Sequence, residues 1–189
     1  MTVSRPPAAP TEARPEAPRG VLRLKLLFAA GSAVFVATMA LLPVYVTGDA
    51  SDYLAMQQAL AHHGTPDLRP EDLASGSGLL LAVGFEAHRR ATFGGDPGTL
   101  HAFPARSGAV YCSHFWLYPL LTLPARSLLV VLGGSELASF QMTNAALMCV
   151  ALYAVLFLWR APGVRRLGFA GLAAAGPALL YLRWMSPEV

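Results

Sequence analysis

The chain has 189 residues, of which 54% are hydrophobic and 13% charged, and its net charge is +3. A mean hydropathy of +0.47 is too high for a soluble domain of ordinary composition. The sequence also lacks the interleaved basic and aromatic residues that are typical of RNA-binding proteins. Together with the elements described below, the composition predicts an all-α, polytopic integral membrane protein with membrane lipid, and no nucleic acid, among its partners.

The N-terminal segment is a tail rich in proline, alanine and arginine, and we expect residues 1–20 to be disordered. An uncharged apolar stretch follows, and the predicted first transmembrane helix covers residues 21–47. The alternative of a cleaved signal peptide fits less well, because the apolar run is about twice as long as a signal peptide needs. Three basic residues lie before the uncharged apolar stretch: Arg19, Arg23 and Lys25. By the positive-inside rule, they place the N-terminus in the cytoplasm.

Two carboxylates, Asp49 and Asp52, follow the first predicted span and open a polar loop over residues 48–138 that we expect outside the membrane. Acidic groups at a membrane face are candidates for acid/base or metal-binding chemistry. The alternative is helix capping, with Asp49 as the N-cap and Asp52 as its capping-box partner, favoured by the helix dipole.

Apolar residues recur at three- and four-residue spacing directly after these acids. The spacing predicts an amphipathic helix near residues 49–63 that lies on the outer membrane surface. Its other side would carry Gln57 and Gln58. Residues 67–111 contain repeated glycines and prolines, and we interpret them as an ordered but irregular external loop. One short apolar run, from Leu79 to Phe85, could be a helix or a strand.

Residues with metal-binding or redox chemistry are few. His62 and His63 are adjacent, and neighbouring positions on a helix point in different directions, so we expect no metal site there. Cys112 lies in the polar loop and Cys149 in an apolar segment. A disulfide would have to join different depths of the membrane, so we predict two free cysteines.

A second surface-lying or re-entrant helix is predicted near residues 114–132. Pro119, Pro124 and Arg126 make this segment a poor span, because a charge at the bilayer centre costs several kcal/mol unless it is paired. If the segment did cross, the basic residues that follow the next apolar segment would lie outside, against the positive-inside rule.

The rest of the chain alternates between apolar and basic segments. A second transmembrane helix is predicted over residues 139–160, a basic cytoplasmic loop over residues 161–166, and a glycine-rich third transmembrane helix over residues 167–185. Residues 186–189 add no polar tail to this helix. Three spans are few for so large an external loop, and we expect a truncated product.

With its elements in this order, the chain resembles the N-terminal part of GT-C class membrane glycosyltransferases, which take sugars from polyprenyl-phosphate carriers and include enzymes of the dolichyl-phosphate-mannose-mannosyltransferase type. The segment from Gly48 to Leu54 is similar to the family's Gly-Asp-Glu-x-x-Tyr-Leu after the first span. The segment from Gly108 to Leu121 is similar to its His-Pro-Pro-x-Tyr-Pro-Leu-Leu. Gly134-Ser135-Glu136 and Ser186-Pro187 follow in the family's order, and the family has two juxtamembrane helices in its first external loop.

The resemblance implies an inverting sugar transfer at the outer face of the inner membrane, from a polyprenyl-phosphate-linked sugar. Asp49 would be the catalytic base that takes the acceptor's proton. Ala50 replaces the family's second acid, so Asp52 is a further catalytic candidate. The resemblance fixes no metal ligands, and a divalent metal is the one cofactor that it allows. Candidates for binding the substrate or the lipid phosphate are Tyr53, His114 and Arg126.

Each candidate has a structural alternative. His114 stands near Trp116 and Tyr118 and also fits an aromatic belt at the membrane interface, while Arg126 also fits a side chain that extends to lipid headgroups. We expect the chain alone to be inactive, because the later spans of the family's donor site would be missing. The alternative function is a small non-enzymatic membrane protein, or an accessory subunit that presents its external loop to a membrane protein partner.

Overall fold

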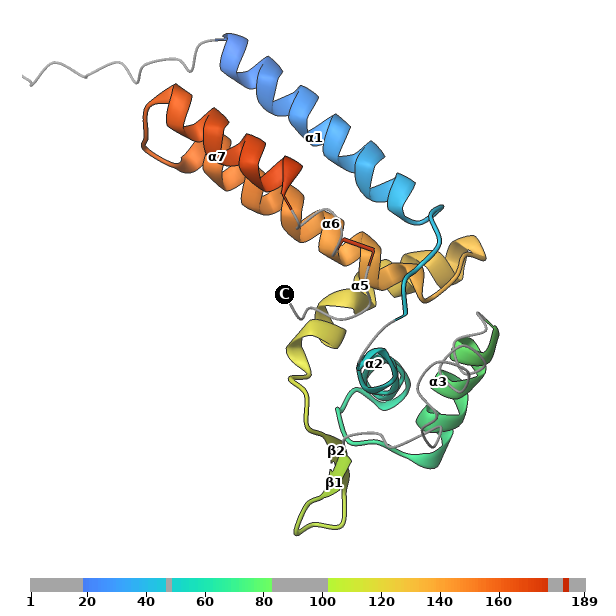
Figure 1. Cartoon of the computed structure of the whole chain (residues 1–189). Helices are drawn as coiled ribbons and strands as arrows, with labels where there is room; N and C mark the ends of the chain where they lie inside the picture. Colours follow the sequence, from blue (N-terminus) through green and yellow to red (C-terminus); the bar gives the residue numbers. More distant parts are fainter. Residues whose placement is uncertain (1–18, 47–48, 83–101, 177–181, 184–189) are drawn as a thin grey trace, which may run out of the picture.

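The described part of the chain is mostly helical and divides into a bundle of long helices and a compact region beside it (Figure 1). The predicted tail and the predicted truncated end lie outside the described residues, except that Arg19 and Gly20 begin the first helix. The structure is a computed structural model and describes four segments: 19–46, 49–82, 102–176 and 182–183.

The long-helix bundle consists of α1 (Arg19–Met39), α6 (Ala138–Tyr153) with the π-helix η1 (Ala154–Leu158), and α7 (Gly163–Ala175). Figure 1 shows α1 and α6 side by side and running in opposite directions, and the two helices pack against each other. Two of these helical stretches are long and apolar enough to cross a membrane, with 20 residues in α1 and 21 residues in α6 and η1 together.

The first helix ends earlier than the sequence pattern predicts, at Met39 rather than at residue 47. Pro43 has no backbone N–H, and it disfavours helical geometry at the residue before it. The last turn is already tightened, because the backbone N–H of Ala40 bonds to the oxygen of Ala37 at 3.1 Å. The chain turns at residues 40–42, and residues 43–46 continue without helix.

The prediction of three spans is supported only in part. The helix α7 begins at Gly163 and has 13 residues, whereas about 20 are needed to cross a bilayer. Part of the segment predicted as the third span lies outside the described residues. Beyond α7, Arg183 lies at the other end of the bundle, where its backbone oxygen accepts a 2.9 Å hydrogen bond from the N–H of Tyr45.

The compact region, which we call the α2 region, contains α2 (Ala50–His63), α3 (Pro70–Ala82), α5 (Leu117–Leu132) and a hairpin of β1 (Ala102–Pro104) and β2 (Val110–Cys112). The strands are antiparallel, with Phe103 opposite Tyr111. Figure 1 shows α2 between α3, the hairpin and α5, and α2 packs against both of those helices. The hairpin departs from the all-α prediction.

The helix predicted near residues 49–63 is confirmed, but it does not have one polar exposed side. Gln57 and Gln58 are buried, as are Leu54 and Met56 on the apolar side. The amide of Gln57 donates to the Thr122 hydroxyl on α5 and, at 2.9 Å, to the Ser139 hydroxyl on α6. The sequence pattern predicts these glutamines on the polar side of the helix, away from the apolar residues. In the structure they instead bond α2 to α5 and α6.

The prediction of an irregular loop over residues 67–111 is wrong in its first part, because α3 begins at Pro70. Proline fits the first position of a helix, and two acidic residues follow it in the first turn, Glu71 and Asp72. The glycine motif that suggested a break includes Gly76, which lies inside this helix. A Cβ atom at Gly76 would lie 3.7 Å from the Leu54 side chain, so α3 approaches α2 closely there.

The helix predicted near residues 114–132 is confirmed as α5, which has 16 residues and Pro124 in its interior. It ends at Gly133, whose φ of 70° is the left-handed conformation that favours glycine at a helix C-terminus. The turn after Gly133 brings α6 back against α5.

Candidate functional site

The two acids that follow α1 stand at the start of α2. Asp49 directly precedes the helix, and its backbone oxygen accepts hydrogen bonds from the N–H groups of Asp52 at 2.9 Å and Tyr53 at 3.2 Å. The Asp49 side chain makes no capping hydrogen bond to this first turn. The capping interpretation of Asp49 is therefore not supported, and the side chain has a different partner.

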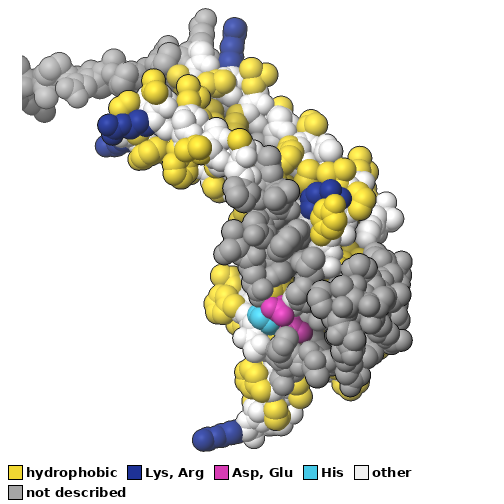
Figure 2. Space-filling view, viewed as in Figure 1, with side chains coloured by type: hydrophobic (Ala, Val, Ile, Leu, Met, Phe, Trp, Pro, Cys, Tyr) yellow, Lys and Arg dark blue, Asp and Glu magenta, His cyan; other side chains and the backbone are white. Residues whose placement is uncertain are grey.

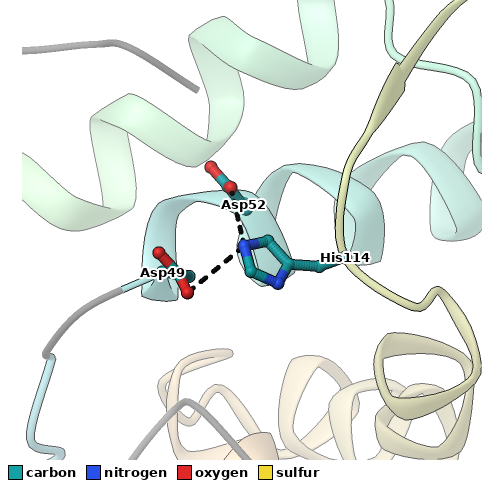
Figure 3. Close-up of side chains that lie close together, drawn as sticks. All are labelled: Asp49, Asp52 and His114. Atoms are coloured by element: carbon teal, nitrogen blue, oxygen red, sulfur yellow. Dashed lines mark ion pairs between the residues drawn. The ribbon is translucent and has the colours of Figure 1, made fainter. Parts of the chain in front are cut away.

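That partner is His114, which lies on the connection between β2 and α5 (Figure 3). Its Nε2 atom is 3.2 Å from Oδ2 of Asp49 and 3.3 Å from Oδ2 of Asp52. Figure 3 shows both carboxylates approaching the same ring nitrogen from one turn of α2. The sequence points to the two acids as a pair and to His114 independently, and the fold brings the three together. His114 faces this acid pair, which the aromatic-belt alternative does not predict.

Exposure distinguishes the two acids. The side chains of Asp49 and His114 are each 21% exposed, whereas that of Asp52 is 1% exposed. The surface view shows histidine and acidic side chains next to each other between the bundle and the hairpin (Figure 2). An external molecule can therefore reach Asp49 and His114, while Asp52 orients the imidazole from inside.

The ring of Tyr53 packs beside the ring of His114. The centroid of its ring lies 5.2 Å from that of His114 and 5.5 Å from that of Tyr118 on α5. Tyr53 itself is buried. Its position fits support of the histidine ring better than direct contact with a lipid phosphate.

The three side chains also have the chemistry of a metal site. One oxygen of each carboxylate and one nitrogen of His114 lie within 4.8 Å of one another. Carboxylate oxygen and imidazole nitrogen suit Zn²⁺ and Mn²⁺ in particular, and second ligands would come from water or substrate. The arrangement can therefore serve as an acid/base group or as the protein half of a divalent-metal site.

Cys112 lies beside this site but does not share its chemistry. Its sulfur is 3.8 Å from the backbone oxygen of Asp52. Burial, and secondarily the charge of Asp52, raises the pKa of the Cys112 thiol to about 12. Cys112 and Cys149 are both free, as predicted. Since the reactive form is the thiolate, this raised pKa makes Cys112 a poor nucleophile at neutral pH.

Arg126 is the candidate that does not join the site. Its guanidinium pairs with Glu136 at 2.8 Å and donates to Oε1 of Gln58 at 3.2 Å. The Gln58 amide in turn donates to Glu136 at 3.2 Å, and the Ser75 hydroxyl donates to Oε1 of Gln58 at 3.3 Å. Arg126 therefore joins α5 to α2 and to the start of α6, and neither the phosphate nor the headgroup interpretation is needed to explain it.

A second histidine–carboxylate cluster lies at the C-terminal end of α2. Nδ1 of His62 is 2.9 Å from one oxygen of Asp72, and Nε2 of His63 is 3.0 Å from the other. The N–H of Arg69 donates to Asp72 at 2.9 Å, which is half of a capping box for α3. The sequence predicts that these adjacent histidines point in different directions, yet both contact the single carboxylate of Asp72. The signal that could have found Asp72 is Pro70-Glu71-Asp72, a helix start within reach of the histidines.

Comparison with protein families, with curated protein sequences and with solved structures finds no match to this chain.

Proposed function

We propose that the chain carries the acceptor-activating part of a membrane glycosyltransferase that resembles the GT-C class. The donor would be a polyprenyl-phosphate-linked sugar, and the reaction would take place at the outer face of the inner membrane. The observation that supports this proposal is the meeting of Asp49, Asp52 and His114 just after the first membrane-length helix.

In this proposal Asp49 is the general base, because it is the accessible acid of the pair. Asp49 takes the proton of the acceptor hydroxyl while the hydroxyl oxygen attacks the anomeric carbon. The bond between that carbon and the phosphate oxygen breaks, and polyprenyl phosphate leaves with the bonding electrons. Attack opposite to the leaving group inverts the anomeric configuration.

His114 has the second role, at the phosphate. Its imidazole is partly exposed, and its Nε2 atom lies within 3.3 Å of a carboxylate oxygen of both acids. A protonated histidine can donate to the phosphate oxygen as negative charge develops there. Asp52, which is enclosed, keeps the ring oriented toward the opening. A divalent metal held by the same three groups would supply the same charge stabilisation.

Donor binding and sugar transfer are tested separately, because we expect no turnover by this chain alone. The purified chain is placed in nanodiscs, and binding of radiolabelled polyprenyl-phosphate hexoses and pentoses is measured. We expect binding that falls at least about tenfold in His114→Ala, the loss of one charge-assisted hydrogen bond. Asp49→Asn should still bind the donor, and in membranes it should abolish any transfer of label to endogenous acceptors.

The competing function is that of a non-enzymatic membrane protein or accessory subunit, in which His114 fastens the segment before α5 to α2. The contact of one imidazole with two acids and with the Tyr53 ring favours this role as well. Under it, no polyprenyl phosphate binds, and Asp52→Asn and His114→Ala lower the unfolding temperature. Donor binding that is equal in wild type and His114→Ala would also exclude the proposed enzyme site.

A further inference from the structure

Basic side chains collect at the end of the bundle where α1 begins, which is the end remote from the Asp49 cluster. Figure 2 shows Lys and Arg side chains at this end of an otherwise largely hydrophobic surface. Most of them are exposed, but Lys25 on α1 and Arg166 on α7 are half-buried. Half-buried cations beside apolar helices need a partner for their charge.

These two cations line a cavity of about 530 Å³ between α1, η1 and α7. The other lining side chains are apolar and include Leu24, Phe28 and Phe157. Phe28 also lines a second apolar cavity of about 350 Å³, which extends along α1 and α6 toward the middle of the bundle. Because both cavities are lined by Phe28, apolar side chains continue from the two cations toward the middle of the bundle.

Within the described segments, no carboxylate neutralises the charges at this opening. No acidic side chain among the described residues pairs with Lys25 or Arg166. The Nη1 atom of Arg166 donates to the Leu156 oxygen at 2.8 Å, but its buried Nε–H has no hydrogen-bond partner within the described structure. The Lys25 ammonium lies about 6 Å from the centroids of the Tyr153 and Phe157 rings, at 6.0 and 5.9 Å.

The π-helix η1 contributes to this geometry. Turns of π-helix are rare and are frequent at functional sites, since they change which backbone groups are bonded within the helix. Here Leu156 and Phe157 of η1 both line the cavity, and the Leu156 carbonyl accepts from Arg166. The π-helical turn therefore holds the Arg166 side chain at the opening through the Leu156 oxygen, while the Nε–H of Arg166 has no hydrogen-bond partner within the described structure.

We propose that this cavity binds an anionic phospholipid, whose phosphate contacts Lys25 and Arg166 and whose acyl chain lies past Phe28. Basic pockets between membrane helices bind acidic lipid headgroups, and an apolar path beside them suits the chain of the same lipid. The inference rests on the membrane location of α1 and α6 and not on the glycosyltransferase chemistry. It concerns the end of the bundle opposite to the proposed donor site.

The test titrates the delipidated full chain in a zwitterionic detergent with phosphatidylglycerol and counts bound lipid by native mass spectrometry. Phosphatidylcholine with the same acyl chains and soluble glycerol phosphate are the comparison ligands. We expect one phosphatidylglycerol per chain, phosphatidylcholine at least about tenfold weaker, and no binding of glycerol phosphate at the same concentrations. Equal binding of the two phospholipids contradicts the charge recognition, and binding of glycerol phosphate alone contradicts the acyl-chain path.

Charge variants locate the phosphate. Because a basic residue near a membrane surface contributes about 1 kcal/mol, the double variant Lys25→Gln with Arg166→Gln should weaken phosphatidylglycerol binding about 30-fold. The matched control replaces two exposed basic residues at the same end, Arg23→Gln with Arg165→Gln, and should change binding less than about threefold. Equal losses in the two double variants would falsify a defined site.

A cavity-filling variant tests the path without changing any charge, and it keeps the proposal testable if the charge variant does not fold. Gly163 lines the cavity, and a Cβ atom there meets nothing within 4 Å, so Gly163→Leu can enter the cavity without a clash. We expect it to lower the bound lipid at least about tenfold. Gly168→Leu, which also has open space but does not line the cavity, should bind like wild type. Wild-type binding by Gly163→Leu overturns the proposal.

Discussion

The long-helix bundle exposes many of its apolar side chains, whereas the α2 region encloses polar side chains. In the bundle many large apolar residues face outward. The most apolar part of α1, which is long enough to cross a membrane, has no buried residues. In the α2 region the interior contains polar groups that are bonded to one another. Buried polar residues of the described chain lie in this region or in the first two turns of α6: Asp52, Gln57, Gln58, Asp72, Thr122, Ser139, Gln141 and Thr143.

This difference shows which surroundings each part needs. A helix that exposes leucine and valine on most sides gains stability from an apolar environment, because little of its apolar surface is covered by the protein. The α2 region bonds many of its buried polar side chains to one another or to residues at the start of α6, although Oε1 of Gln57 and Nε of Arg126 have no hydrogen-bond partner among the described residues. We therefore expect detergent or lipid to hold the bundle together, and the protein's own contacts to hold the α2 region together.

The largest expected effect comes from the shared core. Phe140 is fully buried where α6 meets Tyr118 and α2, and Phe140→Ala should lower the free energy of unfolding by about 3–5 kcal/mol. Phe169 in α7 is 55% exposed, so Phe169→Ala should change it by less than about 0.5 kcal/mol. Chemical denaturation in detergent measures both. Similar losses in the two variants would mean that the bundle has its own protein-packed core.

The next effect tests the polar interior of the α2 region. Asp72→Ala removes the contacts of both histidines and the N–H bond of Arg69, and it should cost about 2–3 kcal/mol at neutral pH. The control is Asp67→Asn, whose side chain is more exposed and contacts His63 only at 3.9 Å, and which should have a smaller effect.

The same carboxylate gives the α2 region an acid sensitivity that the bundle lacks. Burial alone would raise the pKa of Asp72, but the contacts of His63, His62 and the Arg69 N–H together lower it below 3.8. A lowered folded-state pKa adds stability that is complete above the unfolded value and is lost as pH falls through the folded value. The stability difference between wild type and Asp72→Ala should therefore shrink below pH 3.8. A constant difference down to pH 2 would show that the charge of Asp72 is unimportant.

The smallest effect concerns the junction of the two parts. The Gln141 amide donates to the backbone oxygens of Met39 and, at 2.8 Å, of Leu42, so it fixes α6 to the end of α1. Gln141→Leu should cost about 1–2 kcal/mol, because both oxygens lose their donor. The control is Thr38→Val, which removes an exposed hydrogen bond within α1 and should stay within about 0.5 kcal/mol. Unfolding in detergent distinguishes them, and equal values would remove Gln141 as the link.

Much of the helical framework was predictable because it follows from local apolar spacing. The helices at Ala50–His63 and Leu117–Leu132 and the membrane-length stretch Ala138–Leu158 all lie close to their predicted ranges. The helix α3 was missed because Gly76-Ser77-Gly78 was weighted as a break, whereas the helix start at Pro70 was not weighted at all. The spacing of apolar residues alone does not show that a glycine lies inside a helix rather than at a break.

The candidate site was predictable by residue but not by geometry. Asp49, Asp52 and His114 were chosen from the order of motifs in the chain, and the fold places them within contact of one another. The partner of Arg126 was missed because Glu136 lies beyond the turn at Gly133, just before α6 begins at Ala138. A pairing across a turn depends on how two helices cross, which a single sequence does not specify.

The bonds of Gln57 impose an order on folding that differs from the order of the chain. Its hydroxyl partners on α5 and α6 lie 65 and 82 residues further along. Closing such long loops comes late, after local helices have formed. Until Ser139 has been synthesised, α2 must keep two neighbouring glutamines hydrated in water. Although α2 precedes α5 and α6 in the chain, its Gln57 side chain is therefore enclosed only once both of them are in place.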